Sequence, residues 1–435
     1  MKRLLFLIAA IFTISVSQIA SAQWVQVGAS GHRVDALVTT DSNTIPGRSV
    51  GLYAGTHDCF VFFSADTGAT LQEVGDSIIY NEGGQAVLSL AVIDTMVFAG
   101  TFGNVNRSTD HGKTWTAFGN SLMSNFPVYG LNLIGAGSLR PTLFASSYGL
   151  FSSTDSGRTW IPSSTGFSSS TLPAEAVVEM GTEFFAATWN GVYCSRDSGK
   201  SWINTGLADT SANCLVVSGS NTSPRELITG TNKGVLISSD TGKNWISMSS
   251  GLQLYSPPDN KKYCYISALT MNGTNLFTGA NAYGNYSSGV FVSINNGTSW
   301  LQMNAGLEDT NVFALAIVGP YLFAGTNNGV WRRSIAEMIG SAGVGTKPTT
   351  DYRLSTYPNP FTDKTTITLS PSESGVVELS VVNLLGQEVA RVFEGELSAG
   401  EHSFTWDASG LPDGMYECVV RMNGRAQELP IVLAR

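Results

Sequence analysis

The sequence is poor in charged residues. Lys, Arg, Asp and Glu together make up 13% of its 435 residues, about half of the roughly 25% that is usual for a globular protein. The formal net charge of −9 offers no basic surface for nucleic acid or for an anionic membrane. We therefore expect no nucleic-acid partner and a surface built largely from Ser, Thr, Asn and Gly.

Cysteine is scarce and irregularly placed. The five cysteines are Cys59, Cys194, Cys214, Cys264 and Cys418, and none belongs to a C-x-x-C pair. An odd number without regular spacing predicts neither a disulfide framework nor a zinc site. We expect small buried apolar side chains, and the pattern leaves open one disulfide among Cys194, Cys214 and Cys264.

Long apolar runs and common catalytic motifs are also missing. Beyond the N-terminus no apolar stretch reaches the roughly 18 residues of a membrane span, so we expect no transmembrane segment in the mature chain. The sequence contains no G-x-S-x-G, no H-E-x-x-H and no phosphate-binding glycine loop, the signatures of serine hydrolases, zinc proteases and nucleotide sites. We expect no metal and no cofactor.

The N-terminus has the three parts of a secretory signal peptide. The basic start Met1–Arg3 precedes an apolar run, Leu4–Ile14, and the small residues Ala20–Ala22 precede Gln23. This order predicts export with cleavage after Ala22. Residues 1–22 are therefore assigned to a signal peptide.

An eight-residue pattern, S-x-D-x-G-x-[TS]-W, recurs six times with decay, and a period of this size predicts a repeat architecture. In each octet the acidic side chain can accept hydrogen bonds from backbone N–H groups about two residues on, while the glycine supplies a positive φ. The tryptophan should pack on the neighbouring sheet. The third positions, at intervals of 42 to 55 residues, are Asp66, Asp110, Asp155, Asp197, Asp240 and Asn295.

Asn295 decides how these octets are interpreted. An amide keeps the hydrogen bonds of a turn but cannot act as an acid, a base or a strong metal ligand. We therefore assign the six positions a structural role rather than a catalytic or metal-binding one.

Each repeat contains four predicted strands. A strand of the type Leu-Phe-Ala-Gly-Thr precedes each octet and occurs seven times, for example at Leu52–Thr56 and Leu322–Thr326. An alternating apolar strand rich in small and β-branched residues comes before it, a third strand enters the octet, and a fourth leaves through the tryptophan. Four strands in about 45 residues form a propeller blade.

The seventh repeat ends at Arg333 without a fourth strand. The N-terminal segment Trp24–Gly28 is similar to Trp300–Asn304, which follows the sixth octet, so we expect it to complete the last blade and remove an open sheet edge. The predicted fold is all-β, with a seven-bladed β-propeller over residues 23–334 closed by the N-terminal strand. A six-bladed ring is the alternative, and it would leave one of these segments unpaired.

The octet resembles the Asp-box, or BNR, repeat of sialidase-like, xyloglucanase-like and sortilin-like β-propellers. The resemblance covers Gln23 to about Ser334. It implies a fold rather than a reaction, since that family includes glycosidases, receptors and assembly factors.

A second domain follows a predicted linker at residues 335–351, in which Ile335–Gly340 reads as one helical turn. Short alternating strands over residues 352–435 predict a small C-terminal β-sandwich. The segments Tyr357–Phe361, Leu384–Val389, Trp406–Asp407 and Leu411–Tyr416 resemble the type IX (Por) secretion C-terminal sorting domain. That resemblance implies handling by the type IX secretion machinery and a secreted or cell-surface protein. A carbohydrate-binding sandwich is the alternative.

The longest interval between octets indicates a binding face. The 55-residue interval before Asn295 contains two insertions, Gln253–Cys264 and Asn281–Ser288, which we expect on the face away from the octets. Insertions on one face of a repeat protein usually indicate the binding face. Aromatic rings beside amides suit sugar rings or extended peptides, so we predict a glycan or protein ligand. The predicted ligand-binding residues are Tyr148, Trp189, Asn190, Asn232, Tyr283, Tyr286 and Asn327.

Enzymatic alternatives have weaker support. A sialidase needs three arginines around a carboxylate, and only Arg33 is placed on the predicted face. A polysaccharide-degrading glycoside hydrolase is the alternative function; it would use two carboxylates, for which Asp209 and Asp309 are the best pair. These two lie in matching loops two blades apart, which favours a role in turns, so no catalytic residue is assigned.

Overall fold

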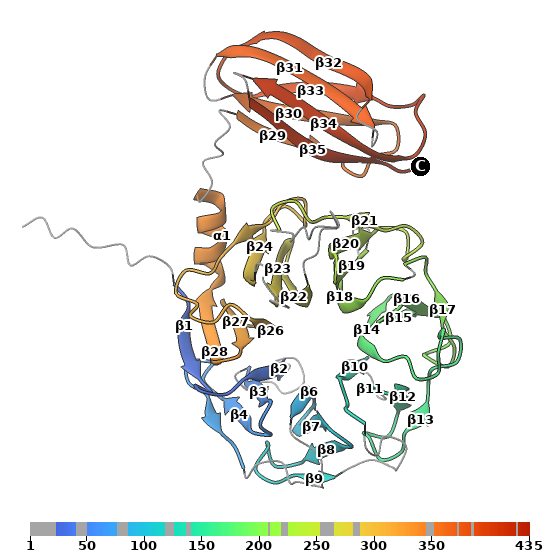
Figure 1. Ribbon diagram of the computed structural model, residues 1–435, viewed down its shortest axis with the longest axis vertical. Helices are drawn as coiled ribbons and strands as arrows, with labels where there is room; N and C mark the ends of the chain where they lie inside the picture. The colour runs from blue at the N-terminus through green and yellow to red at the C-terminus, as the bar shows by residue number, and fades with distance from the viewer. Residues whose placement is uncertain are drawn as a thin grey trace, which may run out of the picture.

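The computed structural model describes residues 23–40, 50–75, 86–117, 126–135, 141–207, 209–218, 225–252, 265–281, 288–344, 352–371, 374–383, 387–422 and 425–435. Within these residues, seven four-stranded antiparallel sheets are arranged as the blades of a ring (Figure 1). Two further sheets, of three and four strands, form the C-terminal domain. The predicted all-β fold, a propeller followed by a small β domain, is confirmed.

The strands of each blade follow one another from the axis outward, except in the last blade. Blades 1 to 3 contain β2 (Val34–Thr39), β3 (Leu52–Thr56), β4 (Val61–Ser64) and β5 (Gln72–Glu73); β6 (Val87–Ile93), β7 (Met96–Thr101), β8 (Val105–Ser108) and β9 (Thr116–Ala117); β10 (Gly130–Ile134), β11 (Thr142–Ser147), β12 (Gly149–Ser153) and β13 (Ile161–Pro162). Blades 4 to 6 contain β14 (Ala174–Met180), β15 (Glu183–Thr188), β16 (Gly191–Ser195) and β17 (Ile203–Asn204); β18 (Ala212–Ser218), β19 (Glu226–Thr231), β20 (Gly234–Ser238) and β21 (Ile246–Ser247); β22 (Ile266–Asn272), β23 (Asn275–Ala280), β24 (Gly289–Ser293) and β25 (Leu301–Gln302).

The last blade joins the two ends of the propeller. It contains β26 (Val312–Val318), β27 (Tyr321–Thr326) and β28 (Gly329–Ser334), and β1 (Val25–Gly28) pairs with β28 as its outermost strand. Trp24 strengthens this closure because its indole N–H donates to the carbonyl of Met303 at 2.6 Å. The N-terminal strand therefore completes the sheet that the sequence leaves one strand short.

Phenylalanines of the second strands fill the space between blades. Phe323 of blade 7 is fully buried and packs with Leu52 and Ala54 of blade 1. Burying one such side chain contributes about 1.5–3 kcal/mol, so these contacts hold adjacent blades together. The same position of other second strands carries the fully buried Phe98, Phe144, Phe185 and Phe277.

The octets form tight turns between the third and fourth strands. In the blade 3 octet, Asp155 accepts hydrogen bonds from the backbone N–H and hydroxyl of Thr159, at 2.9 and 2.7 Å, and from the hydroxyl of Ser153 at 2.8 Å. Ser156 and Gly157 both have positive φ, 57° and 79°. The backbone donor lies four residues beyond the aspartate, not the two expected from the sequence, because two consecutive left-handed residues extend the turn.

Asn295 keeps the same geometry. Its Oδ1 accepts from the backbone N–H of Ser299 at 2.9 Å, and its Nδ2 donates to the Ser299 hydroxyl at 2.9 Å. One side-chain hydrogen bond is reversed and none is lost. The turn therefore needs hydrogen-bonding capacity at this position rather than a negative charge.

Two tryptophans of the octets form hydrogen bonds to a neighbouring blade. The indole N–H of Trp202 donates to the carbonyl of Ser163 in the preceding blade at 2.8 Å, and that of Trp300 donates to Met248 at 2.7 Å. The octet glycine also needs space, since a Cβ on Gly199 would lie 2.7 Å from a ring atom of Phe144. The turns therefore fix the spacing of the blades as well as the local hairpin.

A helix follows the last blade. Helix α1 spans Ile335–Val344, which is longer than the one turn expected from the sequence. Ile335 and Met338 are buried in the cluster that contains Trp24 and Trp331, so this part of the predicted linker packs on the propeller. Residues 345–351 lie outside the described residues.

The C-terminal domain is a pair of packed sheets. One sheet contains β29 (Tyr352–Tyr357), β30 (Lys364–Pro371) and β33 (His402–Asp407). The other contains β32 (Glu388–Leu397), β31 (Gly375–Asn383), β34 (Gly414–Met422) and β35 (Arg425–Leu433). Their facing side chains, including Phe361, Trp406 and Tyr416, form one buried core.

Among the described residues, Cys59, Cys194, Cys214 and Cys418 form no disulfide. Burial raises the pKa of the Cys214 and Cys418 thiols to about 12, so both are inert. Cys264, the third member of the set for which the sequence left a disulfide open, lies outside the described residues.

Replacing Asp155 tests the role of the octet. Asp155→Ala removes three hydrogen bonds from the turn and should lower the free energy of unfolding by about 2 kcal/mol. Asp155→Asn should lose much less, because Asn295 shows that an amide fits. Denaturant unfolding of the full chain measures both variants, and equal losses would contradict a turn that needs only hydrogen bonds.

The octet aspartates should also control acid stability. Hydroxyl donors, Ser64, Thr114 and Ser201 respectively, hold the pKa of Asp66, Asp110 and Asp197 at about 2, below the ordinary 3.8. A carboxyl whose pKa is lower in the folded state stabilises the fold above its unfolded pKa, and that contribution is lost as the pH falls.

Asp197→Asn should therefore flatten the pH dependence of unfolding between about pH 4 and pH 2. Asp94→Asn, an exposed aspartate in the β6–β7 turn, is the control and should leave the curve unchanged. Identical acid transitions for wild type and Asp197→Asn would exclude the assigned linkage.

Candidate functional site

The predicted ligand-binding residues lie in turns at one end of the blades. Trp189 and Asn190 connect β15 and β16, Tyr148 connects β11 and β12, Asn232 follows β19, and Asn327 follows β27. These turns adjoin the starts of the inner strands, while the octets are at the other end. Tyr283 and Tyr286 lie outside the described residues.

A cavity of about 500 Å³ opens at this end of the propeller axis. We call it the axial cavity. Residues at the starts of the inner strands of all seven blades line it, together with Asn281 and Asn327 from the adjoining turns. The principal lining residues are Arg33, Asp35, Tyr129, Glu175, Tyr265 and Phe313.

A register shift aims side chains into this cavity. In six of the innermost strands, the second residue of the strand is skipped, that is, left unpaired with the neighbouring strand of its blade. The register shift lies between Val34 and Ala36 in β2 and between Ala174 and Ala176 in β14. A residue left unpaired in this way is re-aimed out of the ladder. All six skipped residues line the axial cavity: Asp35, Leu88, Glu175, Asn213, Ser267 and Phe313.

One wall of the cavity contains Glu175 and Tyr129, and Trp189 lies beside it. Trp189 Nε1 donates to Glu175 Oε1 at 2.6 Å, and the Trp189 and Tyr129 ring centroids are 5.7 Å apart. Glu175 is only partly covered because it faces the cavity, but the protein atoms around its carboxyl raise its pKa by desolvation, against the opposing effect of the Trp189 hydrogen bond. An acid in this state holds a proton more tightly than usual.

The wall at blade 1 carries a compact charged cluster. Asp35 is buried, with 7% of its side chain exposed, and bonds Arg33 Nε and His57 Nδ1, each at 2.7 Å. The Arg33 guanidinium lies 4.1 Å from the centre of the Phe313 ring. These contacts hold the three polar groups in place at the cavity edge.

Aromatic side chains continue outside the cavity. Phe102, Phe126, Tyr148 and Trp189 are 40 to 52% exposed, and the rings of Phe126 and Tyr148 are 4.2 Å apart. They come from blades 2 to 4. We call these four residues the aromatic rim.

Among the predicted amides, Asn190 links two neighbouring loops by hydrogen bonds, whereas Asn327 faces the cavity. Asn190 donates to the Ser168 hydroxyl at 3.0 Å and accepts the backbone N–H of Asp209 at 3.1 Å. Asn327 lines the cavity. In the pair considered for a hydrolase, Asp309 accepts the backbone N–H of Asn311 at 2.8 Å, as a turn aspartate does. Neither Asp209 nor Asp309 is among the cavity-lining residues.

Sequence reasoning missed Asp35, Glu175 and Tyr129 as site residues. A signal for the first two was present, because each is a charged residue at the second position of a largely apolar innermost strand. Such a residue is costly to bury without a purpose. Arg33, which the sequence placed on this face, lines the cavity, and it is the one arginine that does so among the described residues.

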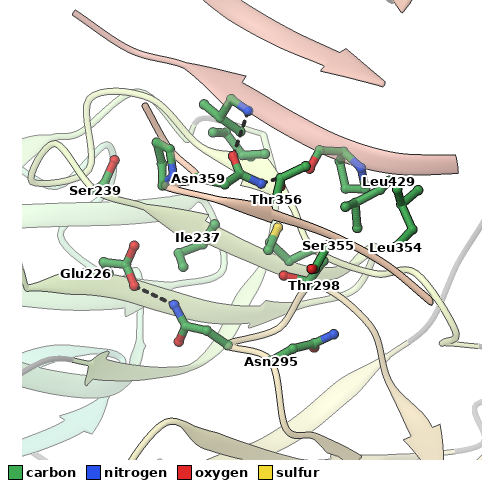
Figure 2. A pocket seen from close by; sticks show the side chains of 16 residues that line it. Glu226, Ile237, Ser239, Asn295, Thr298, Leu354, Ser355, Thr356, Asn359 and Leu429 are labelled. Atoms are coloured by element: carbon green, nitrogen blue, oxygen red, sulfur yellow. Dashed lines mark hydrogen bonds between the residues drawn. The ribbon is translucent and has the colours of Figure 1, made fainter. Parts of the chain in front are cut away.

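A second cavity, of about 250 Å³, lies between the propeller edge and the C-terminal domain (Figure 2). Ile237 and Met248 line it from blade 5, and Leu354 and Leu429 from the C-terminal domain. Glu226 accepts a hydrogen bond from Asn296 at 2.9 Å there. It shares no lining residue with the axial cavity.

Within the described residues, no helix is long and apolar enough to cross a membrane. The same part of the chain brings together no three His, Cys, Asp or Glu side chains suited to a metal ion.

The fold and cavity define a β-propeller with an axial ligand-sized pocket, joined to a small β domain. Family models match both parts. Residues 355–432 match the secretion system C-terminal sorting domain, and residues 141–331 match the DUF6242 beta propeller domain. The sorting domain indicates export by type IX secretion to the cell surface or the medium.

Solved structures share the fold at low sequence identity. YCF48 bound to a D1 peptide is 12% identical with a TM-score of 0.53, over 73% of this chain and 98% of YCF48. The extracellular domain of a hybrid two-component system of B. thetaiotaomicron is 13% identical with a TM-score of 0.54, over 95% of this chain and 57% of that one.

An ancestral GH74 enzyme is 15% identical with a TM-score of 0.50, over 95% of this chain and 64% of the enzyme. No curated protein sequence matches the chain. The shared feature of these structures is the fold alone.

Glu175→Gln should stabilise the protein at neutral pH. Folding raises the pKa of this carboxyl, so its ionised form is less stable in the folded protein than in the unfolded chain. The carboxyl therefore lowers the free energy of unfolding at a pH where it is ionised, but not at a pH below its pKa in the unfolded chain. The amide still accepts the Trp189 hydrogen bond but carries no charge. We expect unfolding free energies equal to wild type near pH 4 and higher than wild type near pH 8.

Glu179→Gln, an exposed residue at the other end of the same strand, is the control. It should leave the unfolding free energy unchanged at both pH values. A loss of stability in Glu175→Gln at pH 8 would mean that the carboxylate supports the fold instead.

Proposed function

We propose that the mature protein is an exported recognition protein that binds a segment of a protein or glycan at the axial cavity and the aromatic rim. The single observation that carries this proposal is the convergence of the skipped inner-strand residues on one cavity. Its volume of about 500 Å³ falls within the range of about 300–1,000 Å³ that is usual for ligand sites.

The aromatic rim supports this proposal. Exposed aromatic side chains on one face provide apolar contact area at low cost in conformational entropy. Tyr148 and Trp189 are half exposed and lie beside the cavity, so a ligand held in the cavity could extend across them. The YCF48 complex supplies a precedent for peptide binding by a protein of this fold.

The two ends of the chain fit the same proposal. Residues 1–22 would direct export across the inner membrane, and residues 352–435 would be recognised by the type IX secretion machinery. We assign the propeller to residues 23–334. Helix α1 packs on it through Ile335 and Met338, so the connecting segment proper would begin after Val344.

A glycoside hydrolase is a second candidate because Glu175 and Asp35 line one cavity in different environments. Glu175 has a raised pKa, as a general acid requires, and Asp35 is paired with Arg33 and His57. Two carboxyls in contrasting surroundings are the arrangement that glycosidases use. Reducing-sugar release from a panel of polysaccharides, lost in Asp35→Asn, would support this candidate, and no release across the panel would exclude it.

Removing aromatic contacts tests the binding proposal. A glycan array and a pull-down with the full mature chain identify a ligand, and Trp189→Ala and Tyr148→Ala should each weaken its binding by roughly tenfold, the effect of losing about 1.4 kcal/mol of contact energy. Titration calorimetry measures the change.

Ile161→Ala is the matched control, since Ile161 is 61% exposed on the outermost strand of blade 3. It should leave affinity unchanged. A ligand that binds all three variants as well as wild type would place its site elsewhere on the molecule.

A further inference from the structure

Glu175 differs from the other charged groups of the axial cavity because no basic side chain among the described residues pairs with it. Its carboxyl accepts a hydrogen bond at Oε1 from Trp189 Nε1. Asp35, across the cavity, has both Arg33 and His57 as partners. Within the described part of the chain, an ionised Glu175 therefore has no counter-ion.

Two ionisable groups that face Glu175 from adjacent strands, Tyr129 and Cys214, are neutral at neutral pH. Burial and the charge of Glu175 raise the pKa of Tyr129, at the start of β10. Burial raises the pKa of the Cys214 thiol in β18 to about 12. Lys233, on the neighbouring turn, donates to the Thr210 hydroxyl at 3.3 Å. Among the described residues, neither these two neutral groups nor Lys233 forms an ion pair with Glu175.

Aromatic faces stand beside the acid. Trp189 and Tyr129 have their ring centroids 5.7 Å apart at an angle of 57°, and Trp189 is 50% exposed. Aromatic rings attract ammonium and guanidinium groups through their electron-rich faces, more strongly where water is excluded. A carboxylate without a counter-ion adds charge attraction in the same place.

We propose that the axial cavity binds the cationic side chain of a Lys or Arg residue in a protein ligand, with Glu175 as counter-ion, Tyr129 as an aromatic wall and Trp189 as a second ring at the rim. This inference rests on the proposed function, which makes the cavity a ligand site, and it names the chemistry of the ligand. A cation gives Glu175 the partner it lacks, whereas a neutral sugar leaves the carboxylate uncompensated. The volume of about 500 Å³ holds one such side chain with its flanking backbone.

Small probes test the charge requirement on the full mature chain. Titration calorimetry compares N-acetyl-lysinamide and N-acetyl-argininamide with N-acetyl-norleucinamide, which has an apolar chain without the charge, and with glucose. The cationic amides should bind more tightly than both neutral probes, by roughly tenfold or more. Equal binding of cationic and neutral probes, or no binding of the cationic ones, overturns the inference.

Glu175→Gln separates charge from structure. The amide preserves the Trp189 hydrogen bond, so the two aromatic rings stay in place, and the variant should lose the preference for cationic probes. Glu179→Gln changes the net charge equally and should retain it. Cationic binding by wild type should weaken as the pH falls through the raised pKa of Glu175, and Glu175→Gln should lack this dependence, which separates it from any titration of Asp35 and His57.

The two proposals fail in different ways. Suppose that Trp189→Ala weakens the binding of the ligand found by screening, while Glu175→Gln binds that ligand as tightly as wild type does. The inference of a cationic ligand is then wrong, but the proposed binding site is retained. Glucosamine is the matched probe for a cation carried by a sugar, and tighter binding of glucosamine than of both cationic amides overturns the assignment to a protein ligand.

Discussion

The pairing of β1 with β28 is the constraint on which the structure depends. Val25 and Gln26 pair with Arg332 and Trp331, so residues about 300 positions apart form the outer edge of the last blade. Without this pairing β28 would present an open edge to other chains, and Trp24 would not fill the cluster that also receives helix α1. Closure turns seven similar sheets into a ring, and the ring creates the axis.

The axial cavity is a consequence of that ring. Every inner strand starts at the same end of the axis, and the skipped residue in six of them leaves the ladder at the same height. The backbone of the blades is therefore regular, while the side chains that face the cavity differ from blade to blade. Blade 1 contributes a paired aspartate and arginine, and blade 4 contributes an acid that accepts a hydrogen bond from a tryptophan and has no counter-ion in the part of the chain that the structure describes. Specificity in such a fold depends on these few differences.

Much of the architecture could be read from the sequence because its causes are local or repeated. The octet is such a case, since all the hydrogen bonds of Asp155 fall within Ser153–Thr159. The strands of the C-terminal domain follow from alternation and turns. Helix α1 was underestimated because its stability comes from burying Ile335 and Met338 against distant parts of the chain.

The sequence by itself determined the repeat, the turns, the missing strand of the last blade and the sorting domain, since each depends on neighbouring residues or on comparison of one repeat with another. Only the tertiary structure decided the surroundings of the Glu175 carboxyl and hence its raised pKa. Its environment is assembled from Tyr129, Trp189 and Cys214, which belong to three different blades, and desolvation depends on atoms brought together by closing the ring. Desolvation of the carboxyl and the lack of a counter-ion among the described residues are properties of that assembly, which no single segment encodes.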